Sequence, residues 1–262
     1  MIKLVVTDLD GTLLDRQSNL SELNKKAIDD CRKNGIGVIL ATGKSVAAIG
    51  HLIEMLSLKL PQITLNGSVV VDSSFNVVKS TKLGQKYFYD LLGTIKEKKY
   101  NPLVALENGK IIYDRYDPSF EVFKAIDEPL SVVKQLENDE YAKMCVSVGT
   151  VIEESDPLDD FLRKKYGKVL QIIRSGKYFF DILNRDASKG KSLEFICQAY
   201  GIKKEEVAVI GDSPNDLSMF EYSRISIAVK NSYPEVSKKA DFITDENYND
   251  GFAKAIYKYI LK

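Results

Sequence analysis

Four acidic residues could form a metal site, although they lie far apart in the chain. Asp8 and Asp10 follow an apolar, β-branched run near the start of the sequence, and Asp212 and Asp216 follow a second such run. Runs of this kind, ended by turn residues, predict buried strands. Several carboxylate oxygens at neighbouring strand ends suit a hard cation such as Mg²⁺. The sequence therefore predicts a Mg²⁺ site held by two strand ends.

The first pair of acids has a local alternative. If the chain stays extended, Asp8 and Asp10 point to the same side of the strand. Two buried carboxylates repel each other and are costly unless a cation lies between them. Taken alone, Asp-Leu-Asp-Gly also suits a strand end with an Asx turn that Gly11 completes. The joint pattern of four acids favours the cation site over turn residues.

The second pair of acids is predicted to open a helix. Ser213 suits an N-cap and Pro214 suits the first helical position. Asp216 then lies one helical turn beyond Asp212, near a helix N-terminus, which favours negative charge. Both acids are therefore expected at the end of their strand.

Around these motifs, strands alternate with helices. Helices are predicted at residues 22–34, 46–57, 188–200, 215–222 and 251–261, and strands at 3–7, 38–41, 63–65, 69–71, 207–210, 225–229 and 242–244. This alternation predicts an α/β fold with a doubly wound, mainly parallel sheet. Ligands bind beyond the carboxyl ends of such strands, so Asp8, Thr42, Asn66 and Asp212 are expected at one edge.

From about residue 82 the pattern changes. A helix is predicted at 85–98, a hairpin at 103–106 and 111–113, a strand at 143–148, a helix from the N-cap Ser155 to residue 166, and strands at 169–173 and 178–182. Hairpins mixed with helices predict a separate α+β unit of roughly residues 83–184. The aromatic stretches at 87–89 and 178–180 are expected in its core rather than as a base-stacking platform.

Four ordered motifs give the chain a resemblance to a known family. Asp-Leu-Asp-Gly-Thr-Leu-Leu at residues 8–14, Thr42-Gly43, Ser188-Lys189-Gly190 and Gly-Asp-Ser-Pro-Asn-Asp at 211–216 resemble the motifs of the haloacid dehalogenase (HAD) superfamily of phosphohydrolases. More narrowly, the chain is similar to the Cof-type sugar-phosphatase branch of this superfamily. The resemblance implies a Rossmann-like HAD catalytic core of residues 1–82 and 185–262, with residues 83–184 inserted as a cap domain.

The resemblance also implies roles for the four acids. Asp8 would be the nucleophile that forms an aspartyl-phosphate. Asp10 would protonate the leaving oxygen and then activate water as a base. Mg²⁺ would be held by a carboxylate oxygen of Asp8, the main-chain carbonyl of Asp10, and Asp212. Asp216 would bind the metal or steer the site from just outside the ligand set.

Basic and neutral donors complete the predicted site. Thr42, with Gly43, matches the second motif and would hold a phosphoryl oxygen. Lys44 stands where that motif more often has arginine, so a two-pronged donor is replaced by a point charge. Lys189 opens a helix, where the dipole disfavours a cation, so a neighbouring anion is expected. Thr42 and Lys189 are assigned to catalysis together with Asp8 and Asp10. Substrate binding is assigned to Thr42, Gly43, Lys44, Lys189, and the neutral donors Asn66 and Asn215.

Other features exclude several classes of protein. Two Gly-Lys-Ser triplets resemble the end of a phosphate-binding loop, but Val38 and Arg185 stand where that loop requires its first glycine. Lys+Arg and Asp+Glu both number 37, so net charge argues against a nucleic-acid or anionic-membrane partner. Cys31, Cys145 and Cys197 are expected as core residues. The single histidine, His51, makes histidine-based catalysis improbable.

The resemblance implies a Mg²⁺-dependent enzyme that hydrolyses a small phosphorylated metabolite, such as a sugar phosphate. The alternative is a phosphomutase on the same scaffold. A receiver module would be about half this length, and a non-catalytic relative would be expected to lack Asp8 or Asp10. Cytoplasmic location is expected, and the oligomeric state, monomer or dimer, is open. Specificity would come from cap side chains, for which Tyr113, Lys143 and Arg174 are candidates.

Overall fold

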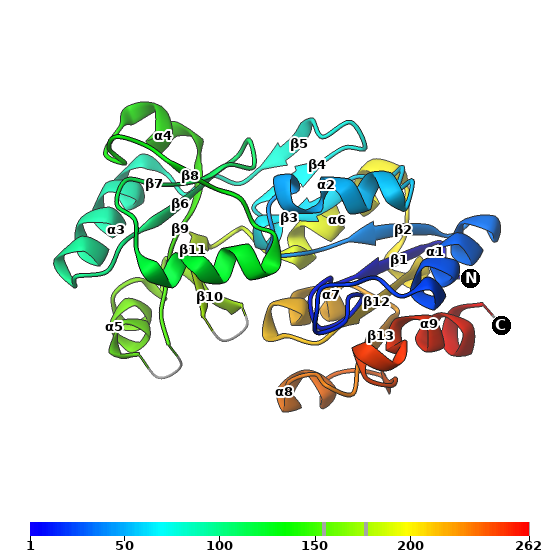
Figure 1. Ribbon diagram of the computed structural model, residues 1–262. Helices are drawn as coiled ribbons and strands as arrows, with labels where there is room; N and C mark the ends of the chain where they lie inside the picture. The colour runs from blue at the N-terminus through cyan, green and yellow to red at the C-terminus, as the bar shows by residue number, and fades with distance from the viewer. Residues whose placement is uncertain (154–155, 176–177, 262) are drawn as a thin grey trace.

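A five-stranded parallel sheet forms the centre of one lobe (Figure 1). The computed structural model describes residues 1–153, 156–175 and 178–261. The sheet order is β14 (Phe242–Ile243), β13 (Ile225–Ala228), β12 (Val207–Gly211), β1 (Leu4–Thr7) and β2 (Gly37–Leu40). The two strands that carry the acids are therefore neighbours, in register from Leu4 opposite Val207 to Thr7 opposite Ile210. The predicted parallel α/β fold is confirmed.

Helices cover both faces of this sheet because side chains alternate along its strands. Val5 packs in a cluster with α1 (Glu22–Lys33), α2 (Val46–Met55) and α9 (Gly251–Ala255). Leu4 and Val6 point the opposite way, toward α6 (Lys189–Tyr200) and α7 (Leu217–Glu221). A short helix, α8 (Pro234–Ser237), and a π-helical turn at Ile256–Ile260 complete the lobe.

The predicted strand at residues 63–65 does not extend the parallel sheet. β3 (Gln62–Thr64) meets this edge of the sheet through an isolated parallel bridge between Ile63 and Ala41, the residue after β2, and through a hydrogen bond from the Leu40 amide to Gln62 Oε1. It instead pairs antiparallel with β4 (Val69–Val71), which pairs with β5 (Val77–Ser80). Sequence analysis missed β5, whose side chains are all exposed or half-buried and so lack an apolar pattern.

The second lobe is built on a six-stranded sheet within the segment predicted as the cap. Its order is β10 (Leu170–Ser175), β11 (Phe179–Asn184), β9 (Cys145–Val151), β6 (Leu103–Leu106), β7 (Ile111–Tyr113) and β8 (Leu130–Val132). One face is covered by α3 (Gln85–Glu97) and α5 (Pro157–Tyr166), near α4 (Asp139–Met144). The other packs against β4 and a 3₁₀ helix at Pro118–Ile126.

Two details of this lobe differ from the prediction. Lys143 lies in α4 rather than in a strand, and the strand starts at Cys145. The N-cap of α5 is Asp156, whose side chain accepts a hydrogen bond from the Leu158 amide. Ser155, the predicted cap, lies outside the described residues. The sequence alone does not decide which of two adjacent residues is the N-cap, because Ser and Asp suit that position equally.

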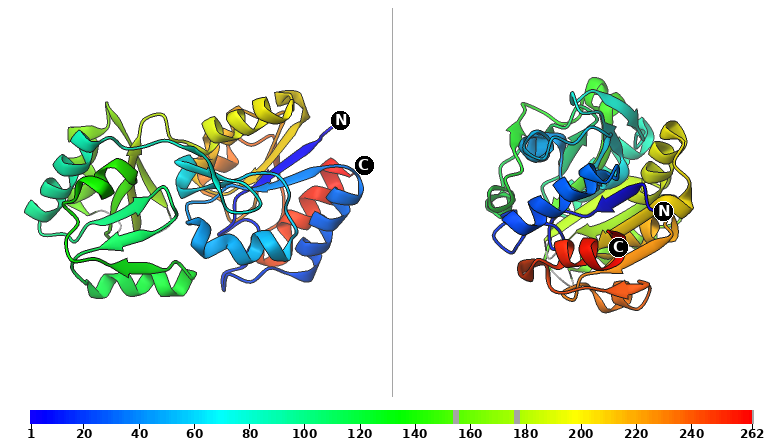
Figure 2. Two further views of the ribbon diagram at one scale, coloured as in Figure 1. Left: turned by 90° about the horizontal axis from the view of Figure 1, so that it is seen from above. Right: turned by 90° about the vertical axis from the view of Figure 1, so that its right-hand side faces the viewer.

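Figure 2 shows the two lobes side by side, with both chain termini at the end of the parallel-sheet lobe farthest from the cap. The domain limits at residues 82/83 and 184/185 stay predictions. Cys31, Cys145 and Cys197 are buried and free, as expected of core residues. No helix in the described part of the chain combines the length and apolarity that a bilayer crossing requires.

Candidate active site

The pairing of β1 with β12 brings the two acidic motifs together. Asp8 follows the end of β1, and its amide donates to the Ile210 carbonyl at 2.9 Å. Asp212 follows the end of β12. Carboxylate oxygens of Asp8, Asp212 and Asp216 all lie within 4.8 Å of one another, and the three residues are buried. The sequence prediction that these acids meet at the carboxyl edge of the sheet is confirmed for these three residues.

Asp212 is held in place by the first motif. The Thr12 hydroxyl donates to Asp212 Oδ1 at 3.0 Å, and the Ser213 hydroxyl donates to Oδ2 at 3.1 Å. A Cβ on Gly11 would lie 2.8 Å from Asp212 Oδ2, and Gly11 has a φ of +83°. Only glycine combines that backbone conformation with so close an approach. Thr12 was not predicted as a site residue, although it belongs to the motif.

Lys189 links the acids from the first turn of α6. Its Nζ lies 2.6 Å from Asp8 Oδ1 and 2.7 Å from Asp216 Oδ1, and its side chain is 1% exposed. Ser188 caps the helix by accepting from the Lys191 amide. Burial would lower the pKa of Lys189, but the Asp216 and Asp8 carboxylates outweigh burial and raise it. The predicted anion beside Lys189 is thus a pair of carboxylates.

Asp216 lies one turn beyond Asp212, as predicted, and both of its oxygens have partners. Oδ1 accepts from Lys189, and Oδ2 accepts from the amides of Asp212 and Ser213, each at 3.0 Å. Burial raises the pKa of Asp216 to about 6, against the opposing effect of Lys189. Asp216 thus accepts three hydrogen bonds, of the roughly four that a carboxylate can accept, and two of them fix the backbone of the Asp212 loop.

The charge balance of this cluster fits a divalent cation. Three buried carboxylates face one ammonium, that of Lys189. Burial raises the pKa of Asp212, and the neighbouring Asp8 and Asp216 carboxylates raise it further. In a buried site, ionised carboxylates repel one another, and an added positive charge stabilises their ionised forms. The donor set is all oxygen, which suits Mg²⁺ better than a softer metal.

The Asp10 carboxylate does not belong to the cluster formed by Asp8, Asp212 and Asp216. Its side chain is 43% exposed, and its Oδ1 lies 2.9 Å from Lys44 Nζ. β1 ends before Asp8, so the strand does not continue through the two acids, but Asp8 and Asp10 line the same cavity. Lys44 is 7% exposed and lines the same cavity, as do Thr42 and Gly43. Asp10 therefore faces the cavity beside a cation.

Asn66 and Asn215 connect the predicted site to the cap. Asn215 Nδ2 donates to Asn66 Oδ1 at 2.9 Å. Asn66 Nδ2 lies 3.3 Å from Asp181 Oδ2, across the boundary between the lobes. Asn66 adopts a φ of 55° in the 3₁₀ turn Leu65–Gly67, a conformation that Asn tolerates better than most residues. Its amide donates to the Thr42 carbonyl at 3.0 Å, so this turn is joined directly to the Thr42-Gly43 motif.

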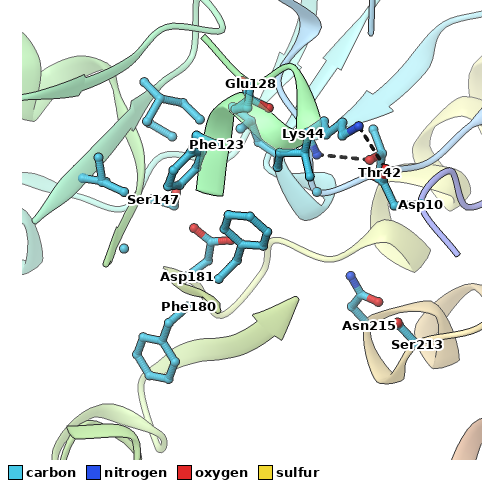
Figure 3. Close-up of a pocket in the computed structure, with 18 of the residues that line it drawn as sticks. Asp10, Thr42, Lys44, Phe123, Glu128, Ser147, Phe180, Asp181, Ser213 and Asn215 are labelled. Carbon is cyan, nitrogen blue, oxygen red and sulfur yellow. Dashed lines mark hydrogen bonds and ion pairs between the residues drawn. The ribbon is translucent and has the colours of Figure 1, made fainter. Parts of the chain in front are cut away.

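A cavity of about 360 Å³ lies between the lobes (Figure 3), and Asp8 and Asp212 of the acidic cluster are among the residues that line it. On the parallel-sheet side its wall includes Asp8, Asp10, Lys44, Asp212 and Asn215. The cap side contributes apolar side chains, small polar ones and two acids: Leu103, Ile111, Phe123, Ile126, Glu128, Ser147, Thr150, Phe179, Phe180 and Asp181. Substrate bound here would contact both lobes.

The cap residues of this wall were not predicted from the sequence. Tyr113, Lys143 and Arg174, the candidates, do not line the cavity. Glu128 follows an irregular stretch that carried no pattern. Asp181 did leave a signal, because it is an acid inside the apolar strand β11. Asp181 lies two residues after Phe179 and so shares its face of the strand. An acid among apolar residues on such a face is unusual and indicates a functional surface.

Comparisons with known proteins agree with this geometry. Residues 5–256 match the family model described as haloacid dehalogenase-like hydrolase. The 5-amino-6-(5-phospho-D-ribitylamino)uracil phosphatase YcsE of Bacillus subtilis is 28% identical over 261 residues, covering 99% of this chain and 96% of that protein. A phosphoglycolate phosphatase of Staphylothermus marinus is 29% identical over 266 residues, covering 100% and 99%. A haloacid dehalogenase-like hydrolase of Bacteroides thetaiotaomicron has the same fold, with a TM-score of 0.87, 24% identity, and coverage of 98% and 99%.

The chain therefore belongs to the haloacid dehalogenase-like hydrolases, within the Cof-type branch. It is a phosphatase, a hydrolase of phosphoric monoesters. The relatives named above are phosphatases, so the phosphomutase alternative gains no support from them.

Proposed function

We propose that this protein is a Mg²⁺-dependent phosphatase that hydrolyses a small phosphorylated metabolite through an aspartyl-phosphate on Asp8. The observation that carries the proposal is the position of the Asp8 carboxylate. It lies at the floor of the cavity, 2.6 Å from Lys189 Nζ and beside Asp212. A carboxylate held by a cation and open to a cavity is suited to attack phosphorus.

The reaction has two displacement steps. In the first, an Asp8 oxygen bonds to phosphorus while the bond from phosphorus to the leaving oxygen breaks, and Asp10 gives that oxygen a proton. In the second, Asp10 takes a proton from water, and the water oxygen attacks phosphorus. Inorganic phosphate leaves, and Asp8 is restored as a carboxylate. Asp10 suits this exchange because it is half-exposed to the cavity rather than buried with the other acids.

Mg²⁺ would be held by Asp8, the main-chain carbonyl of Asp10, and Asp212, with Asp216 orienting the Asp212 loop. When bound, the ion neutralises charge on the phosphoryl oxygens. Thr42 and Gly43 would hold a phosphoryl oxygen through hydroxyl and amide, and Lys44 would add positive charge. Lys189 would keep Asp8 in position for attack. Asn66 and Asn215 would act as neutral donors at the rim.

Phosphate release from a panel of phosphomonoesters tests the proposal. The panel holds sugar phosphates, polyol phosphates, phosphoglycolate, nucleotides and p-nitrophenyl phosphate, with Mg²⁺ and with EDTA. We expect release that EDTA abolishes and that Asp8→Asn lowers by about 10³-fold or more. Asp186→Asn, a change to an exposed acid paired with Lys191 at the surface, is the matched control.

Two results would contradict the proposal. Activity that survives Asp8→Asn would mean that another group is the nucleophile. Release unaffected by EDTA would remove the role of the metal. Thermal unfolding gives an independent measure of metal binding, because Mg²⁺ should raise the midpoint of the wild-type protein and not that of Asp212→Asn.

We also propose that the enzyme works in the cytoplasm, which its free buried cysteines suit.

A further inference from the structure

The cap side of the cavity carries two acids and, among the described residues that line the cavity, no cation. Those acids are Asp181 on β11 and Glu128 after the 3₁₀ helix. The only positively charged lining residue in the described part of the chain is Lys44, which is paired with Asp10 on the opposite wall. A leaving group that reaches the cap thus meets negative or neutral polar atoms.

Asp181 is built into this wall. Figure 3 shows its carboxyl group directed toward the middle of the cavity, across from Asn215. Its Oδ2 accepts from Asn66 at 3.3 Å. On the adjacent strand, a Cβ on Gly149 would lie 2.9 Å from Asp181 Oδ1 and 2.5 Å from the Phe180 carbonyl oxygen. Glycine at position 149 therefore leaves the space that the Asp181 carboxyl group occupies.

Glu128, the other acid of this wall, is hydrogen-bonded to the protein itself. One carboxylate oxygen accepts from the Ser45 amide at 2.9 Å, and the other accepts from the Ser45 hydroxyl. Glu128 is 5% exposed, so these bonds join the cap to the start of α2. Its two oxygens are occupied, whereas Asp181 is the acid with an oxygen turned toward the substrate space. Glu128 contributes its charge to the wall rather than a substrate contact.

The environment of Asp181 disfavours further negative charge. Burial raises the pKa of Asp181 to about 7, and the Glu128 carboxylate contributes to the rise. A second anion brought beside it would have to be desolvated without a compensating cation. A hydroxyl or amine group would instead donate a hydrogen bond to the carboxyl oxygen, and this bond offsets the cost of removing the group from water.

Aromatic side chains also line the cap side of the cavity. Phe123 and Phe179 meet edge to face with ring centroids 5.0 Å apart, and both line the cavity. Such a wall packs against the carbon face of a polyol, sugar or ring. The cap end thus suits an organic group with apolar faces and hydrogen-bond donors.

We propose that Asp181 is a specificity-determining residue that accepts a hydrogen bond from a hydroxyl or amine of the leaving group and excludes leaving groups that bear a carboxylate or a second phosphate. This inference rests on the proposed function. The resulting substrate class is neutral or amine-bearing polyhydroxy phosphomonoesters. Phosphoglycolate, the substrate in the name of one relative, falls outside that class.

Matched substrate pairs test the inference. A polyol phosphate and the aldonate phosphate of equal chain length, such as ribitol phosphate and ribonate phosphate, differ only where a terminal hydroxymethyl group becomes a carboxylate. We expect the wild-type enzyme to favour the polyol phosphate by at least about tenfold in kcat/KM. Asp181→Asn should reduce that ratio by about tenfold, mainly by lowering KM for the aldonate. Asp160→Asn, at an exposed cap position on α5, is the control and should leave the ratio unchanged.

The outcomes separate this inference from the proposed function. Failure of the wild-type protein to hydrolyse p-nitrophenyl phosphate or any panel member would overturn the function itself. If the wild-type enzyme hydrolyses the aldonate phosphate with a kcat/KM equal to or above that for the polyol phosphate, the inference about Asp181 is wrong. The proposed function would stand in that case. Selectivity that persists in both Asp181→Asn and the smaller Asp181→Ser would assign it to another residue. A change confined to kcat, equal for both substrates, would indicate a structural role only.

Discussion

The ammonium of Lys189 lies 2.6 Å from the Asp8 carboxylate, which precedes it by 181 positions in the chain. The same nitrogen lies 2.7 Å from Asp216, so one cation joins the first strand, the distal acidic loop and the start of α6. All three side chains are buried. The pairing therefore positions Asp8, the proposed nucleophile, and also contributes to the packing of the lobe.

Replacement of Lys189 by methionine should cost both stability and activity. The change leaves the Asp8 and Asp216 carboxylates buried without their shared cation. Breaking a buried pair in this way destabilises by about 3–5 kcal/mol. We expect a lower free energy of unfolding in urea and a fall in kcat of at least about 10²-fold, because Asp8 is no longer held for attack.

Lys191 supplies the matched control, since it lies two residues further on but pairs with Asp186 at the surface. Lys191→Met should change stability by less than about 1 kcal/mol and leave kcat intact. Equal effects of the two substitutions would show that the contacts of Lys189 have no special role.

Gly67→Ala should separate the turn that carries Asn66 from the helix that carries Lys189. A Cβ on Gly67 would lie 2.2 Å from the carbonyl carbon and oxygen of Ser188, and its φ is +89°. We expect a loss of about 2–4 kcal/mol in urea unfolding, from backbone strain plus the steric clash, and a lower kcat as α6 shifts.

Gly35→Ala isolates the strain from the clash. Gly35 has a φ of +72° but nothing within 4 Å of the added Cβ. This variant should lose only about 1 kcal/mol and keep full activity. If Gly67→Ala lowered the free energy of unfolding no more than Gly35→Ala does, the close approach of Gly67 to Ser188 would not contribute to stability.

Asp181 should make stability depend on pH. Its folded pKa is about 7, against an ordinary value of 3.8, so the unfolded chain releases this proton first as pH rises. The stability that the protonated carboxyl contributes is present below about pH 4 and is lost as pH rises through about 7. The total change is at most about 4 kcal/mol for this pKa difference.

Asp181→Asn removes this titration while keeping an oxygen that can accept from Asn66. In urea unfolding at several pH values, the variant should gain stability relative to wild type between about pH 4 and about pH 7. The nearby acid Glu128 is present in both proteins, so its own titration largely cancels in the comparison. A difference that does not vary with pH would mean that Asp181 is ionised throughout this range.

The sequence was sufficient to predict the site floor because its parts are local. Asp8 and Asp212 each follow a strand with a clear apolar run, and parallel strands align their carboxyl ends. Asp216 follows from helix capping, and Lys189 from its unfavourable place at a helix start. Each prediction required only a short segment and one rule of local structure.

The cap side of the cavity could not be predicted in the same way. Asp181 and Glu128 reach the cavity only because the six-stranded sheet turns one face toward the other lobe. That packing depends on contacts between distant segments, such as Asn66 with Asp181 and Ser45 with Glu128. β5 was missed for another reason: a strand with exposed faces has no apolar alternation to detect.

The most direct test of the account is to trap the intermediate on Asp8. The wild-type enzyme with Mg²⁺ is mixed with its best panel substrate, quenched in acid within a turnover, digested, and analysed by peptide mass. We predict one added phosphoryl group on the peptide that contains Asp8, absent in Asp8→Asn and in EDTA. A phosphoryl group on a different residue, or full turnover by Asp8→Asn, would contradict the assignment of Asp8 as the nucleophile.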